Sequence, residues 1–220
     1  RYVHGDLSRR GFLEQAATFT GGPAAAAALL AALSPDFAGA QQVKPDDPRL
    51  PVRRQSFPSP QGNGQVQGYL AKPAGAAGKL PAVLVVHENR GLNPPIEDIA
   101  RRVALAGYVA YAPDALAPLG GYPGDEDKAR ELFGKLDPAK ARADIVAAAR
   151  GLLTLPDGNG KVGVVGFCWG GSLSNYVATQ VPELAVAVPF YGGAPALEDV
   201  PRIKARLLLN YRSEERRVGK

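Results

Sequence analysis

The hexapeptide GFCWGG, residues 166–171, places the single cysteine of the chain, Cys168, directly after the apolar run KVGVV. Gly166 and Gly170 stand two residues before and two residues after it, which is the spacing of a nucleophile elbow with sulfur in place of the usual oxygen. Such an elbow is a strand-to-helix turn too tight for side chains at those two positions. The pattern therefore predicts a cysteine nucleophile at the carboxyl end of a strand.

A helix starting directly after Cys168 would place the thiol at its N-terminus, where the helix dipole favours the thiolate. The backbone N–H of Trp169 would face the oxyanion that forms when a carbonyl group is attacked. The alternative is that a lone cysteine is a small buried hydrophobic residue without chemistry. A single cysteine also excludes an intrachain disulfide, a CxxC redox pair and a cysteine-rich zinc site.

The segments around the elbow alternate between strands and helices. Apolar runs predict strands at 81–87, 108–112, 162–165, 184–190 and 207–211, and two runs flanking QGNGQ within 52–72 predict a hairpin. Helical spacing and capping residues predict helices at 94–106, 125–133, 137–152 and 169–180. This alternation predicts an α/β fold, with a mostly parallel sheet and helices on both of its faces.

Three segments together resemble the dienelactone hydrolase family, an α/β-hydrolase branch with a cysteine nucleophile. They are HENRGLNPPIEDIARRVALAGYVAYAPD (87–114), KVGVVGFCWGG (161–171) and AVPFYGG (187–193), and the similarity runs from about residue 50 to residue 211. The resemblance implies an α/β-hydrolase fold that hydrolyses an enol lactone or a related small ester. It implies no metal and no organic cofactor.

The resemblance also implies roles for individual residues. Cys168 matches the nucleophile, and Glu88 matches a glutamate that holds the resting thiol and helps to generate the thiolate. The backbone N–H groups of Asn89 and Trp169 match the oxyanion hole. Judged by position alone, Glu88 could instead be a solvated carboxylate at a strand end, and we expect His87 to pack or to hydrogen-bond there.

The substrate side of the site departs from the family. An arginine that grips a substrate carboxylate in that family would fall near Glu126, where this sequence has none. Lys128 and Arg130 are close in sequence, but charges on a helix are usually solvated. Arg90 and Tyr191 are candidates to line a substrate pocket, from their positions within the motifs.

The other two members of a catalytic triad do not follow the cysteine. In α/β-hydrolases the order is nucleophile, acid, histidine. Both histidines of this chain, His4 and His87, precede Cys168, and Asp199 comes before the last predicted strand. We therefore expect residues 51–211 to form a partial α/β-hydrolase domain, incomplete at its C-terminus, and the chain to be inactive.

The last nine residues, RSEERRVGK (212–220), resemble the translation of a common sequencing adapter. We expect this segment to be non-native, so Glu214 and Glu215 are poor candidates for the triad acid. The alternative is a natural basic tail.

The N-terminal segment 1–40 has the features of a twin-arginine export signal. Ser8 to Leu13 (SRRGFL) pairs two arginines with apolar residues, and the apolar stretch Ala24 to Leu33 is too short to span a bilayer. Ala38-Gly39-Ala40 predicts cleavage before Gln41, and residues 41–50 would be a linker. The twin-arginine machinery would then be a partner, and the protein would be periplasmic or secreted. The alternative is that this segment is an ordinary Ala-rich helix.

Composition limits the remaining function classes. Apolar residues make up 45% and charged residues 21% of the 220 residues, with a net charge of +5. The charge is scattered without a basic stripe and interleaved aromatics, so we expect neither nucleic-acid binding nor stable membrane insertion. A thioesterase, a general carboxylesterase and a non-catalytic exported binding domain with a buried structural cysteine stay open as alternatives.

Overall fold

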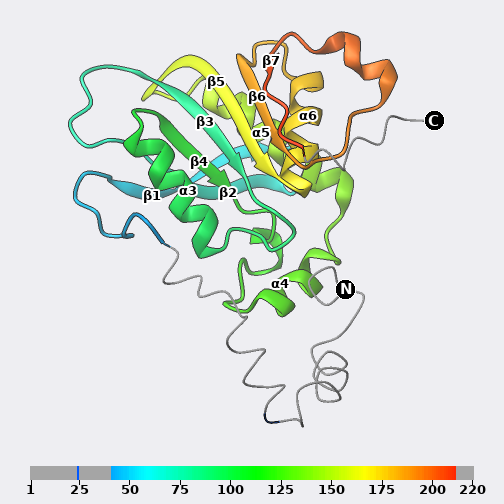
Figure 1. Cartoon of the computed structure of the whole chain (residues 1–220), viewed down its shortest axis with the longest axis horizontal. Coiled ribbons are helices and arrows are strands. Elements are labelled where there is room, and N and C mark those ends of the chain that lie inside the picture. The colour runs from blue at the N-terminus through cyan, green and yellow to red at the C-terminus, as the bar shows by residue number, and fades with distance from the viewer. Residues whose placement is uncertain (1–23, 25–40, 212–220) are drawn as a thin grey trace. The chain divides into compact units, whose positions relative to one another are not determined.

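The computed structural model describes residues 41–211 and residue 24. The predicted export signal, apart from residue 24, and the predicted non-native tail lie outside the described residues. The described part contains a seven-stranded sheet in the order β1-β2-β4-β3-β5-β6-β7 (Figure 1). The predicted hairpin is β1 (Val52–Ser59) and β2 (Gly64–Ala71), which pair antiparallel.

The other five strands run parallel to one another, and β2 joins them antiparallel through β4. They are β3 (Leu80–Val86), β4 (Val109–Pro113), β5 (Gly158–Phe167), β6 (Val186–Phe190) and β7 (Arg206–Leu207). The central strand β3 ends in three fully buried residues, as expected for a strand covered on both faces. Because β3, β5 and β6 run parallel, the segments that follow them lie at the same edge of the sheet.

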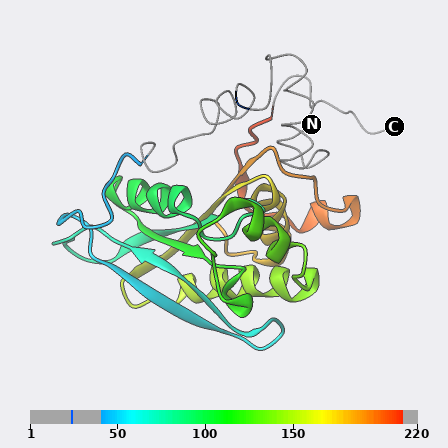
Figure 2. The same ribbon diagram turned by 90° about the horizontal axis from the view of Figure 1, so that it is seen from below.

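Helices cover both faces of this sheet (Figures 1 and 2). On one face α5 (Pro138–Leu153) and α6 (Trp169–Gln180) bury apolar side chains against β3 and β5; on the other, α3 (Pro94–Leu105) packs on β2 and β4. The short α4 (Glu126–Phe133) and the 3₁₀ turns η1 (Ala117–Leu119) and η2 (Leu197–Arg202) lie in the connections. The predicted α/β fold with a mostly parallel sheet is confirmed.

The predicted helix starts follow from capping. The Asn93 side chain accepts a hydrogen bond from the Ile96 N–H at the start of α3. Asp125 and Asp137 do the same for α4 and α5. Each cap satisfies a backbone donor that the first turn of a helix leaves without a partner. None of the helices within residues 41–211 is long and apolar enough to cross a membrane.

The last strand is shorter than the predicted 207–211. In β7 only Arg206 and Leu207 form a regular ladder, followed by a single bridge between Phe190 and Asn210. The cause lies in the neighbouring strand, because Pro189 has no N–H to donate to the partner segment. The N–H groups of Leu208 and Asn210 still donate to the carbonyls of Ala187 and Pro189, each over 3.0 Å.

The predicted linker 41–50 packs onto the domain. Val43 and Leu50 are buried, and the Asp98 carboxylate on α3 accepts hydrogen bonds from the N–H groups of Gln42 and Val43 at 3.0 and 2.8 Å. The buried Arg101 donates to the Val43 carbonyl over 2.9 Å. The polar, proline-rich composition that predicted a linker gave no signal of these two anchors on α3.

Candidate active site

Cys168 occupies the turn between β5 and α6 in a strained conformation, with φ 54° and ψ −110°. A Cβ atom on Gly166 would lie closer than 3.0 Å to the Gly170 carbonyl, and one on Gly170 would lie equally close to the carbonyls of Val86 and His87. The two glycines thus permit β5, α6 and the end of β3 to touch through their backbones. Cys168 itself is exposed, whereas the binding-domain alternative expects a buried thiol.

Two backbone N–H groups near this turn are free to bind an anion. The Cys168 N–H donates to the Phe190 carbonyl of β6 over 3.1 Å, which anchors the turn. By contrast, the N–H groups of Trp169 and Asn89 find no acceptor within residues 41–211. Trp169 opens α6, so its N–H also lies at the positive end of the helix dipole. An oxyanion formed at Cys168 needs donors of this kind.

Glu88 and Tyr191 are brought together across the edge of the sheet. The Tyr191 hydroxyl donates to Glu88 Oε1 over 2.8 Å. Tyr191 directly follows β6 and has a positive φ of 41°, unusual for a bulky residue. Burial, the bond to Glu88 and the nearby Cys168 raise the pKa of Tyr191, so the hydroxyl stays protonated and bound. Within residues 41–211 the hydrogen bond of the Glu88 carboxylate goes to this hydroxyl and not to the thiol.

His87 is fully buried and has a structural part in the site. Its Nε2 accepts the Ala115 N–H over 3.1 Å, so Nδ1 carries the proton and donates to the Glu88 carbonyl over 2.5 Å. Burial lowers the pKa of the ring and keeps it neutral. The ring stacks on the Trp169 indole, with centroids 5.2 Å apart. Both nitrogens are thus engaged away from Cys168, and His87 cannot serve it as a base.

Arg90 and Glu126 form an ion pair, with Arg90 Nε 3.4 Å from Glu126 Oε2. Arg90 also donates to the Asn89 carbonyl over 3.2 Å and to the Asn89 side-chain oxygen. The sequence indicated that Arg90 could line a pocket but gave no sign of its pairing with Glu126. Lys128 is exposed, and Arg130 lies 3.8 Å from Asp127.

The described residues supply no acid or base of the expected triad. Asp199 lies in η2 and pairs with Arg202 at 2.9 Å, before β7 as the sequence suggested. His4, Glu214 and Glu215 lie outside the described residues.

Comparisons with known proteins agree with this geometry. The sequence profile of the dienelactone hydrolase family matches residues 66–218. YghX of Escherichia coli K12, whose name proposes a hydrolase fragment, is 58% identical over 113 residues, which are 51% of this chain and 97% of YghX. A Synechocystis protein whose name proposes a carboxymethylenebutenolidase is 36% identical over 140 residues, which are 60% of this chain and 56% of that protein. The chain thus spans a little over half the length of this second relative.

A solved structure named m3DLH superposes with a TM-score of 0.64 at 29% identity, covering 78% of this chain and 72% of that one. The dienelactone hydrolase-like promiscuous phosphotriesterase P91, from metagenomic libraries, has a TM-score of 0.59 at 27% identity, over 73% and 68% of the two chains. The fold, the strand–elbow–helix unit and the matched residues lead to one conclusion: the chain belongs to the dienelactone hydrolase family, within the α/β-hydrolase superfamily.

Proposed function

We propose that the protein belongs to the hydrolases of small esters or lactones and that Cys168 is its nucleophile. The observation that carries the proposal is the exposed, strained Cys168 at the N-terminus of α6, followed directly by Trp169, whose N–H has no acceptor within residues 41–211. The relatives' names add lactone hydrolysis as the expected reaction, since a carboxymethylenebutenolidase opens a lactone.

In the proposed reaction the Cys168 thiolate attacks the carbonyl carbon, and the N–H groups of Asn89 and Trp169 stabilise the oxyanion. Collapse of this intermediate breaks the carbon–oxygen bond, and the leaving oxygen takes up the proton that was removed from the thiol. Glu88 is the group proposed to accept the thiol proton, for which its carboxylate must exchange the Tyr191 hydroxyl for the sulfur. Water then hydrolyses the thioester and releases the acid.

The final hydrolysis needs a general base to activate water. In the 220-residue chain His87 is engaged at both nitrogens, and no histidine follows Cys168. Triad members act as a unit, so we propose that this chain is acylated at Cys168 but does not turn over.

The test is incubation with p-nitrophenyl acetate followed by peptide mass spectrometry. The proposal expects an acetyl group on the peptide that contains Cys168 and none there in Cys168→Ala. An unmodified Cys168 that still reacts with iodoacetamide would refute the nucleophile assignment, and a Cys168 that reacts with neither reagent until the protein is unfolded would favour the binding-domain alternative.

We further propose export through the twin-arginine machinery, carried by Ser8 to Leu13 and by cleavage after Ala40. Export of a protein folded in the cytoplasm suits a single unpaired cysteine, because cytoplasmic thiols stay reduced.

A further inference from the structure

The geometry points to Glu126 as a positioning residue: through Arg90 it holds Asn89, whose backbone N–H is one of the two proposed oxyanion donors. This inference rests on the proposed function, because it assigns Glu126 a part in acyl transfer to Cys168. Glu126 does not touch the reacting atoms.

The first step is the contact between Arg90 and Asn89. The guanidinium donates both to the carbonyl and to the side-chain oxygen of Asn89, so it fixes that residue by two hydrogen bonds. The Asn89 N–H belongs to the peptide unit of the Glu88 carbonyl, which the His87 ring holds by a hydrogen bond. Arg90 fixes the peptide unit on the other side of the Asn89 α-carbon, so the two contacts together restrict how the Asn89 N–H can turn. Only 18% of the Arg90 side chain is exposed, so water competes little for these bonds.

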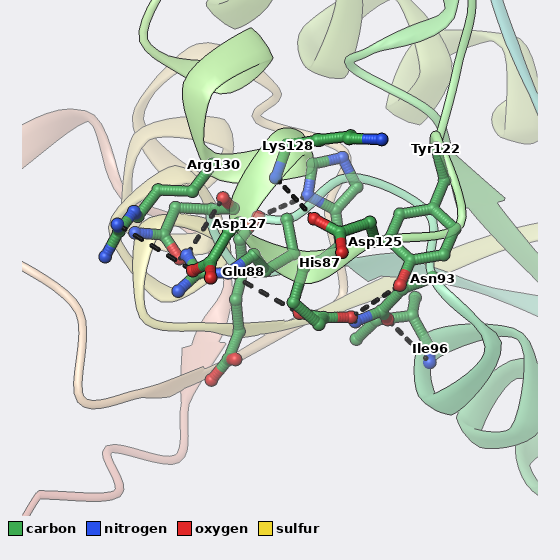
Figure 3. A network of polar contacts seen from close by, with 12 residues as sticks. His87, Glu88, Asn93, Ile96, Tyr122, Asp125, Asp127, Lys128 and Arg130 are labelled. Carbon is green, nitrogen blue, oxygen red and sulfur yellow. Dashed lines mark hydrogen bonds and ion pairs between the residues drawn. The ribbon is translucent and has the colours of Figure 1, made fainter. Parts of the chain in front are cut away.

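The second step is the contact between Glu126 and Arg90. Glu126 Oε2 lies 3.4 Å from Arg90 Nε, whereas the bonds to Asn89 come from Nη1 of the same guanidinium. The carboxylate is itself fixed, because its Oε1 accepts the Tyr122 hydroxyl over 2.8 Å and the Asn93 side-chain amide over 3.1 Å (Figure 3). Burial and this hydrogen bond raise the pKa of Tyr122 to about 12, so it remains a donor at neutral pH. Glu126 therefore ties the Asn89 loop to the N-cap of α3 and to the segment before α4.

The far end of α4 reaches the other oxyanion donor. Phe133, the last residue of α4, packs edge-on against the Trp169 indole with centroids 4.9 Å apart, and it also meets the His87 ring at 6.3 Å. The short helix α4 is thus linked to both residues of the proposed oxyanion hole. Glu126 reaches Asn89 through Arg90, and Phe133 packs directly on Trp169. Glu126 also offsets the positive charge of Arg90.

The test compares Glu126→Gln with Glu131→Gln, a matched control on the same helix whose side chain is exposed. Two rates are measured for each: acylation of Cys168 by p-nitrophenyl acetate, which passes through an oxyanion, and alkylation by iodoacetamide, which does not. Removing an oxyanion donor costs about 10²–10³-fold in rate, so a misplaced donor is expected to cost about 10-fold. Glu126→Gln should slow acylation by that factor and leave alkylation within about twofold of wild type, and Glu131→Gln should change neither.

A second variant, Arg90→Lys, keeps the charge but loses the paired donors to Asn89. It should slow acylation by a similar factor, and the double variant should be no slower than either single one, because both act through the same contact. Equal acylation rates for Glu126→Gln and Glu131→Gln, a parallel loss of acylation and alkylation, or additive effects would refute this inference while leaving the proposed function intact. Absence of wild-type acylation would refute the proposed function and this inference with it.

Discussion

Replacing Gly170 with alanine perturbs the elbow through a single added methyl group. Gly170 lies in the first turn of α6, where alanine is intrinsically favoured over glycine by about 1 kcal/mol. The new Cβ, however, would come closer than 3.0 Å to the carbonyls of Val86 and His87. These are backbone atoms at the end of β3, and Val86 is held in register with Gly166 of β5, so they cannot move aside cheaply.

Overpacking of this kind costs about 1–3 kcal/mol, and rigid backbone neighbours place Gly170→Ala at or above the upper end of that range. After subtracting the helix propensity, we expect a net loss of about 2 kcal/mol in the free energy of unfolding. For a domain of this size 1 kcal/mol lowers Tm by about 2–4 °C, so Tm should fall by about 4–8 °C. The acylation rate of Cys168 should fall too, because α6 and the Asn89 loop move apart.

The assay is thermal unfolding followed by circular dichroism, with Gly134→Ala as the matched control. At Gly134 the backbone is right-handed, with φ −65°, and an added Cβ would lie 3.5 Å from the Glu131 carbonyl, an ordinary contact. That variant should keep or slightly raise Tm. A Tm for Gly170→Ala equal to or above that of wild type would show that helix propensity outweighs the contact, and the tight-elbow reasoning would be refuted.

Three further predictions concern other parts of the chain. Burial lowers the pKa of His87 below its ordinary 6.5, so the unfolded state binds a proton before the folded state does as pH falls. The free energy of unfolding should therefore drop between pH 7 and 5, by at most about 1.4 kcal/mol per pH unit. Urea titrations should find a weaker drop for His87→Gln. Asp98→Ala leaves the N–H groups of residues 42 and 43 without their acceptor. Limited proteolysis within 41–50 should therefore be faster, and the free energy of unfolding should fall by about 2–3 kcal/mol. Unchanged proteolysis would contradict the packing of this segment. Replacing Arg9 and Arg10 together with lysines should abolish export of a fused reporter, and continued export would refute the twin-arginine proposal.

Much of the fold could be predicted because its signals are local. The buried run ending at Val86 is apolar throughout, and Asn93, Asp125 and Asp137 are strong helix caps, so periodicity and capping place these elements within a few residues. The shortened β7 could not be predicted from its own leucines, because the missing donor belongs to Pro189 on the neighbouring strand.

The candidate site likewise has a part that a local sequence pattern predicts and a part that depends on long-range contacts. The elbow is a local pattern of two glycines around Cys168, and it could be recognised without a structure. The bond from Tyr191 to Glu88 spans 103 residues, and the bond from Asn93 to Glu126 spans 33. Such contacts depend on which segments the sheet brings to its edge. For that reason Glu126 was seen in the sequence only as a departure from the family.

The most direct test of Cys168 as nucleophile is the stoichiometry of p-nitrophenol released when the purified 220-residue chain meets excess p-nitrophenyl acetate. The proposed acylation without deacylation predicts a burst of one p-nitrophenol per chain, followed by little further release, and no burst in Cys168→Ala. Steady turnover that depends on Cys168 would contradict the proposed inactivity. A burst that survives in Cys168→Ala, or no burst in the wild-type chain, would contradict the nucleophile itself.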